Sequence, residues 1–151
     1  MKIAASIDIF SKPNDIFAWI ENPDKAMQWQ KGVKTDQIIK ETSGKIGTTF
    51  KEEMEENGKS LITYGEITDY TPNKLISFQL ESKIHKVHVI YSVVGNANQS
   101  RVSVDSTIRW KFPMNLISLI VGYKIKTKIL QQTKSELLEL KKLCEKEVNN
   151  L

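Results

Sequence analysis

The sequence predicts an α+β fold in which a curved antiparallel sheet of seven strands surrounds one long C-terminal helix. Roughly seventy residues before Pro113 alternate between apolar and polar positions, as strands do, and turn residues divide them into short segments. After Pro113, residues 114–148 have the periodicity of one helix, which would span about 50 Å. Such a helix is longer than a small domain needs for simple packing. We therefore expect the sheet to fold around it and to leave a space between them.

One strand and two short helices are expected first. Segment 2–10 alternates isoleucine and alanine with polar residues, which is typical of a half-buried strand. Pro13 favours the first turn of a short helix that ends before Pro23. Asp24 is then expected to cap a second short helix that runs through Trp29.

Six further strands are separated by turn residues. Asn57-Gly58 is the strongest hairpin signal, because Asn and Gly are the residue types that best tolerate the positive φ of a two-residue turn. Gly44 to Gly47 is expected to form another turn. Because the connections are short, neighbouring strands should pair antiparallel. The six strands are expected at 33–41, 47–56, 59–70, 75–82, 84–94 and 101–111.

Length and composition indicate one domain, residues 1–151, of an ordinary globular protein with 40% apolar and 26% charged residues. The N-terminus lacks the apolar stretch of a secretory signal, and no apolar run approaches the ~20 residues that cross a bilayer. The one cysteine, Cys144, excludes an internal disulfide and fits a reducing compartment. A cytoplasmic location is therefore expected.

Motifs for metal or nucleotide chemistry are missing from the sequence. His85 and His88 face opposite sides of one strand, which is poor geometry for a shared metal, and Cys144 lies at the distant end of the helix. Cys144 is expected to be a small buried apolar residue and not a nucleophile, because no histidine should lie near it. We predict neither a metal nor a cofactor.

The formal charge of +4 is mild but unevenly distributed. Glutamates gather in 52–56, whereas the C-terminal stretch is basic. The lysines form either a solvated helix face or a surface that attracts anionic lipid headgroups or an acidic ligand. Nucleic acid is not expected as a partner, because aromatic residues are not interleaved with the basic ones. The basic stretch contains Lys111, Lys124, Lys126, Lys128, Lys134, Lys141, Lys142 and Lys146.

Strand alternation also predicts which side chains face the space inside the sheet. Most inward positions are aromatic or aliphatic, but Glu52, His85 and Ser106 are polar. These three are either rim positions at strand ends or the few polar groups that orient a ligand in an apolar cavity. A buried Glu52 would need a partner or a raised pKa to offset its desolvation. The expected apolar lining is Trp29, Phe50, Met54, Phe78, Tyr91, Trp110, Leu119 and Tyr123.

The long helix is expected to serve two purposes. Residues 114–123 are apolar almost all round and should roof or gate the cavity. Residues 130–144 place apolar side chains at near-helical spacing and should pack on the sheet.

A series of short motifs covers essentially the whole chain in a fixed order: residues 7–20, Asn22-Pro23, Gln28-Trp29, Gly44-x-x-Gly47-Thr48-x-Phe50, residues 68–78 and Leu137-x-x-Leu140-Lys141-x-x-x-Glu145. Together they resemble the START/polyketide-cyclase superfamily (SRPBCC), which has the helix-grip fold of the major birch pollen allergen. The chain looks most similar to its polyketide cyclase/dehydrase and lipid-transport group. Ser11-Lys12 departs from the family's usual Ala-Pro, which leaves the fold prediction intact.

The resemblance implies a shared cavity and not a shared chemistry, because members bind lipids, hormones, quinones or polyketides and a minority are enzymes. Our leading hypothesis is a carrier or sensor that holds a small hydrophobic or lipid-like ligand between the sheet and the C-terminal helix. One alternative is a cyclase/dehydratase-type enzyme acting on a polyketide-like or aromatic substrate, with Glu52 or His85 as general acid or base. Another is a protein- or membrane-interaction module that uses the apolar start of the helix and its lysines.

Overall fold

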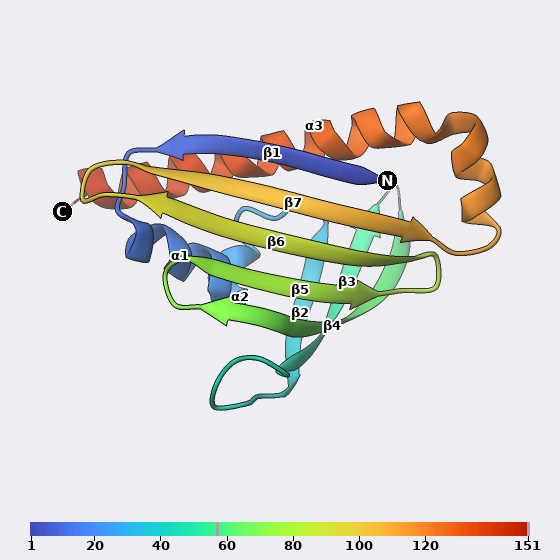
Figure 1. Cartoon of the computed structure of the whole chain (residues 1–151), viewed down its shortest axis with the longest axis horizontal. Helices are drawn as coiled ribbons and strands as arrows, with labels where there is room; N and C mark the ends of the chain where they lie inside the picture. Colours follow the sequence, from blue (N-terminus) through green and yellow to red (C-terminus); the bar gives the residue numbers. More distant parts are fainter. Residues whose placement is uncertain (57, 151) are drawn as a thin grey trace.

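Seven antiparallel strands form one curved sheet in the computed structural model, which describes residues 1–56 and 58–150 (Figure 1). Each strand pairs with its neighbour in the chain except β1, which returns to pair with β7, so the order is β1-β7-β6-β5-β4-β3-β2. The predicted sheet is confirmed. The strands are β1 (Lys2–Ile9), β2 (Val33–Lys40), β3 (Thr49–Glu56), β4 (Lys59–Thr71), β5 (Leu75–Glu81), β6 (His85–Gly95) and β7 (Ser100–Trp110).

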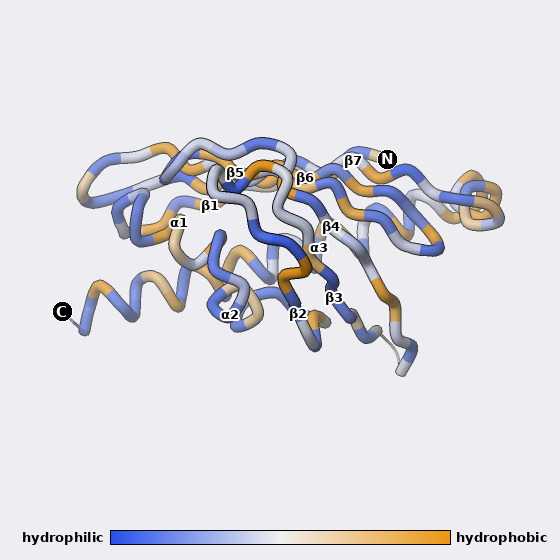
Figure 2. Tube along the Cα trace, turned by 90° about the horizontal axis from the view of Figure 1, so that it is seen from below, coloured by the Kyte–Doolittle hydropathy of each residue, from blue (hydrophilic) through white to orange (hydrophobic). Residues whose placement is uncertain are grey.

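The helices of the described residues are α1 (Pro13–Glu21), α2 (Pro23–Ala26) and the long α3 (Met114–Asn149). Viewed with its strands near the top, Figure 2 shows α1, α2 and the C-terminal part of α3 below β5–β7. The strands also show the alternation of hydrophilic and hydrophobic residues from which they are predicted. No helix in the described ranges is both long and apolar enough to cross a bilayer.

The second short helix differs from its prediction at both ends. Asn22, and not Asp24, is the N-cap, because its side-chain oxygen accepts a hydrogen bond from the Lys25 amide at 3.1 Å. Pro23 occupies the first helical position, where its missing N–H costs nothing. The helix ends at Ala26, and Trp29 lies in the turn that follows.

The turns between strands mostly follow their predictions. Gly44 to Gly47 lies in a turn, with φ of 70° at Lys45 and 89° at Gly47. Of the Asn57-Gly58 pair, Asn57 lies outside the described residues, and Gly58 has φ of 75°. Strands β3 and β4 pair antiparallel up to Glu56 and Lys59, which is the register a hairpin at this point requires.

The C-terminal part of α3 anchors the helix to the sheet, as predicted. Leu137, Leu140 and Cys144 are at most 2% exposed, and α3 packs chiefly against β1. The start of α3 lies elsewhere. Leu119 and Tyr123, expected to roof the cavity, are instead 83% and 85% exposed, because the first turns of α3 extend past the ends of β6 and β7 (Figure 1).

Candidate ligand-binding pocket

A cavity of about 440 Å³, partly open to solvent, lies between the concave face of β2–β6, helix α2 and the middle of α3. This volume falls within the range of about 300–1,000 Å³ that is usual for small-molecule sites. Most of its wall is apolar. The apolar side chains on it include Ile20, Val33, Ile38, Phe50, Met54, Ile67, Ile76, Phe78, Leu80, Val89 and Tyr91.

A row of aromatic rings forms the centre of the apolar wall. Phe50 and Phe78 meet edge to face with ring centroids 5.6 Å apart, and Phe78 meets Tyr91 at 6.3 Å. Gly65 lies opposite Phe50 in the β3–β4 pairing, and any Cβ at this position would overlap the Phe50 ring. Glycine at this position therefore lets the ring lie flat against β4 and keep its place in the wall.

Two carboxyl groups face each other on the polar side of the cavity. Asp36 of β2 and Glu52 of β3 are direct partners in the strand pairing, so their side chains project from the same face of the sheet. Burial, followed by the nearby charge of Asp36, raises the pKa of Glu52 to about 7. Burial also raises the pKa of Asp36, with a smaller contribution from Asp24. Near neutral pH, the pair therefore favours states that carry fewer than two negative charges.

These two carboxyl groups lack the partners that the other acids of the cavity have. The Asp36 Oδ1 atom is buried without a hydrogen-bond donor among the described residues, and no bond to Glu52 is found among them. By contrast, Glu136 of α3 accepts from the Lys31 amide and from Gln132 Nε2, each at 3.1 Å. The arrangement thus leaves two acceptors that a molecule in the cavity can satisfy.

Other acidic and phenolic groups at the cavity are fixed by the protein itself. The Tyr70 hydroxyl donates to Glu21 at 2.5 Å. Burial raises the pKa of Glu136 despite its hydrogen bonds, and burial also raises the pKa of Tyr91. At neutral pH the Tyr91 ring is therefore a neutral part of the wall.

Of the residues predicted to line the cavity, the structure brings five together on its wall: Phe50, Glu52, Met54, Phe78 and Tyr91. Trp29 lies behind them in the core. Its ring meets Tyr91 edge to face at 5.9 Å, and its Nε1 donates to the Trp19 carbonyl at 2.9 Å. Trp29 therefore supports the wall through Tyr91 and is not itself among the lining residues.

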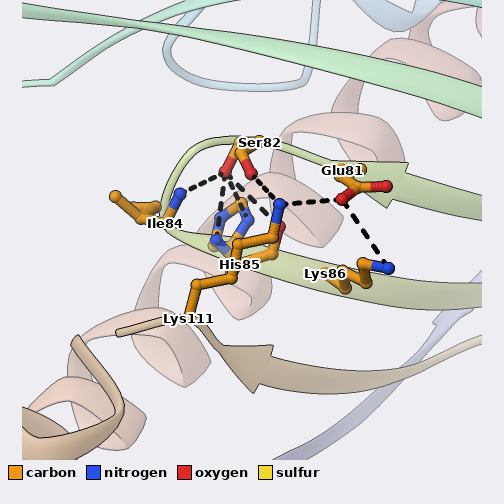
Figure 3. Close-up of polar contacts among 6 residues, drawn as sticks. All are labelled: Glu81, Ser82, Ile84, His85, Lys86 and Lys111. Carbon is orange, nitrogen blue, oxygen red and sulfur yellow. Dashed lines mark hydrogen bonds and ion pairs between the residues drawn. The ribbon is translucent and has the colours of Figure 1, made fainter. Parts of the chain in front are cut away.

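His85 belongs to a polar cluster at the β5–β6 turn (Figure 3). The Ser82 hydroxyl accepts from the amides of Ile84 and His85, each at 3.2 Å, and forms a hydrogen bond of 2.9 Å with His85 Nδ1. Lys111 Nζ donates to the Ser82 carbonyl and to Glu81, both at 2.7 Å. Burial lowers the pKa of His85. These contacts hold the β5–β6 turn together. They fit the first of the two alternatives for His85, a rim position at the end of a strand.

The remaining predicted residues also lie away from the cavity wall. Trp110 of β7 packs beside His85 with ring centroids 5.4 Å apart, and its Nε1 is buried without an acceptor among the described residues. Ser106 lies between Ile3 of β1 and Val89 of β6 in the sheet pairing.

The sequence prediction missed Asp36, Glu136 and Gln132, which supply much of the polar side of the cavity. The sequence does contain a signal for Asp36. It lies two positions before the apolar Ile38, so the two side chains are on the same face of the strand. The two α3 residues carry no such signal, since polar residues four apart on a long helix ordinarily face solvent.

No group of three or more His, Cys, Asp or Glu side chains within the described ranges is placed to hold a metal ion.

Cys144 is 2% exposed, and burial together with nearby carboxylates raises the pKa of its thiol to about 12. The thiol is therefore protonated at neutral pH and packs as a small apolar side chain, as expected from the sequence.

A curved antiparallel sheet around a long C-terminal helix, with a cavity between them, defines the helix-grip fold. No family model matches the sequence, and no curated protein does. Solved structures are similar over nearly the whole chain. A START superfamily protein from Mycobacterium smegmatis is 15% identical with a TM-score of 0.80, covering 96% of this chain and 97% of its own.

Two further similar structures are the Zhui aromatase/cyclase from Streptomyces sp. R1128 and a protein from Thermus thermophilus. The first is 9% identical with a TM-score of 0.79 and covers 98% of this chain and 95% of its own. The second is 12% identical with a TM-score of 0.78 and covers 97% and 99%. The chain thus has the fold of the START/polyketide-cyclase superfamily, which the motif resemblance predicts.

Proposed function

We propose that this protein, as one ligand-binding domain over residues 1–151, is a carrier or sensor for a small hydrophobic or lipid-like molecule. The molecule would occupy the cavity with its apolar body against the aromatic wall and a hydrogen-bond donor directed at Asp36 and Glu52. The observation that carries the proposal is the buried Asp36 oxygen, which lacks a donor among the described residues and lies beside a second unpaired carboxyl group in a cavity whose wall is mostly apolar. Cytoplasmic location remains a prediction from the sequence.

Two energy terms support this assignment. Burying apolar ligand surface stabilises a complex by about 25 cal/mol per Å². The aromatic wall provides this stabilisation for any apolar molecule that fits. A donor that satisfies a buried carboxyl group contributes about 1.5–3 kcal/mol, because the acceptor otherwise stays unpaired. An anionic group at the same place would face the charge of the carboxyl pair. The cavity should therefore prefer a neutral or basic polar end over an acidic one.

A pair of fluorescent probes tests the proposal. N-phenyl-1-naphthylamine carries a neutral N–H donor, and 1-anilinonaphthalene-8-sulfonate adds a sulfonate to the same ring system. We expect the neutral probe to bind at least about tenfold more tightly at neutral pH. The double variant Asp36→Asn with Glu52→Gln should narrow this difference, whereas the control Glu66→Gln, an exposed glutamate of β4, should leave it unchanged.

Failure of both probes to bind would contradict a ligand-binding cavity. Equal binding of both probes would contradict the role of the carboxyl pair while leaving the cavity in place. Native mass spectrometry of protein purified from its own host then identifies any molecule that copurifies, and its polar end can be compared with the proposed donor.

An enzyme is the second candidate function, favoured by the pKa of about 7 at Glu52. A carboxyl group with this pKa can hold or release a proton near neutral pH, as a general acid or base must. With a polyketide-like or aromatic ketone, Glu52→Gln should lower turnover by at least about 100-fold and weaken binding of the neutral probe far less. Turnover that survives the substitution unchanged would remove Glu52 from any such mechanism.

A further inference from the structure

An apolar surface at the start of α3 has no role in the cavity. We define the helix-start patch as Phe112, Leu116, Ile117, Leu119, Ile120 and Tyr123, whose side chains are 45–86% exposed. Cavity residues on α3 begin only at Gln132. Scattered apolar residues are normal on a protein surface, but a contiguous patch of this kind marks an interaction site.

The patch has the geometry of one helix face. Leu116, Leu119, Ile120 and Tyr123 follow the spacing i, i+3, i+4, i+7, so they form a stripe along the helix. Figure 1 shows this part of α3 beyond the ends of β6 and β7, at the end of the molecule opposite the C-terminus. A flat surface can therefore approach the stripe without meeting the body of the sheet.

The charge within and just after the patch along the chain is entirely basic. Residues 112–135 contain Lys124, Lys126, Lys128 and Lys134 and no acidic residue. Their charge of +4 equals the net charge of the whole chain, so the other residues sum to zero. An anionic partner would be attracted to this end of the molecule, whereas a second copy would bring two basic segments together.

We propose that the helix-start patch docks on the surface of an anionic lipid bilayer. The apolar stripe would enter the headgroup boundary, where an amphipathic helix buries its apolar face, and the tyrosine would lie at the interface that aromatic residues favour. Lys124 and Lys126, which lie just after the stripe and are both exposed, would contact lipid phosphates. The inference is independent of the ligand proposed for the cavity.

Vesicle flotation of the full chain tests this docking. Vesicles of phosphatidylcholine alone are compared with vesicles of equal parts phosphatidylcholine and phosphatidylserine. We expect at least about tenfold stronger binding to the anionic vesicles, weakening as salt is added. The double variant Leu119→Ser with Ile120→Ser should weaken binding by about tenfold or more, and so should Lys124→Glu with Lys126→Glu.

Matched variants elsewhere control for loss of exposed apolar surface and of charge. Ile39→Ser with Val94→Ser removes side chains that are 58% and 75% exposed, and Lys40→Glu with Lys74→Glu makes the same charge change. Both controls should bind vesicles as the parent does. Equal binding to vesicles with and without phosphatidylserine would overturn the proposal. Patch variants that bind vesicles as well as their controls do would also overturn it. So would a dimer in sedimentation that Leu119→Ser with Ile120→Ser converts to monomer.

Discussion

Replacing Leu140 with alanine is expected to lower the free energy of unfolding by about 2–5 kcal/mol. The Leu140 side chain is fully buried on the face of α3 that packs against β1, between Leu137 and Cys144. Alanine at this position would bury less apolar surface. It would also leave a cavity, because the surrounding helix and strands are held in place by their hydrogen bonds and cannot move in to fill it. Urea denaturation followed by circular dichroism measures the change.

Leu138 provides the matched control on the same helix. Its side chain is 51% exposed, so Leu138→Ala should change the free energy of unfolding by no more than about 0.5 kcal/mol. The two substitutions remove the same atoms from nearby positions of one helix, and only the packing differs. Similar losses from both would mean that the anchoring face of α3 is assigned incorrectly.

Periodicity is the reason that the sheet and this anchor could be predicted. A strand that packs on one face must alternate, and the faces predicted for β5, β6 and β7 carry the buried residues Ile76, Val89 and Val104. The buried face of α3 shows the helical spacing of Leu137, Leu140 and Cys144 in the same way. Both patterns are local, so a single sequence contains them.

The polar part of the cavity depends on relations that are not local. Asp36 meets Glu52 only through the register of β2 and β3, which are joined by residues 41–48 and interrupted by irregularities between Val33 and Thr35 and between Ile38 and Lys40. A shift of one residue would place Asp36 on the opposite face. The partner of Glu52 therefore could not be predicted, although the need for a raised pKa at a buried Glu52 could.

The helix start shows a different limit. Its apolar surround fits burial under a roof and exposure for a partner equally well, because sequence periodicity does not say how far a helix continues past the sheet. The strands that precede α3 fix where its first turn begins, which is past the ends of β6 and β7 (Figure 1), whereas the α3 residues that line the cavity are Gln132 and Glu136. The lysines that follow the apolar stripe add positive charge to this end of the helix, which is the basis for the proposed anionic partner.

Replacing Glu52 with glutamine is expected to stabilise the ligand-free protein by up to about 3 kcal/mol above neutral pH. Burial raises the pKa of Glu52 from 4.5 in the unfolded chain to about 7 in the folded one. Below pH 4.5 both states hold the proton. Between these values only the folded state holds it, so stability falls as pH rises and the loss is complete above about pH 7. Glutamine has no such loss.

The measurement is the difference in free energy of unfolding between the parent and Glu52→Gln across this pH window, since contributions of all other groups cancel. Glu66→Gln, on the exposed side of β4, is the control and should give a much smaller difference. A pH-independent difference at Glu52 would contradict its burial without a partner. This expected gain in stability would accompany the smaller preference for the N-phenyl-1-naphthylamine probe that is expected when both carboxyl groups are replaced. A residue that weakens the empty fold and strengthens probe binding acts as a binding group, because a structural group would stabilise the empty fold.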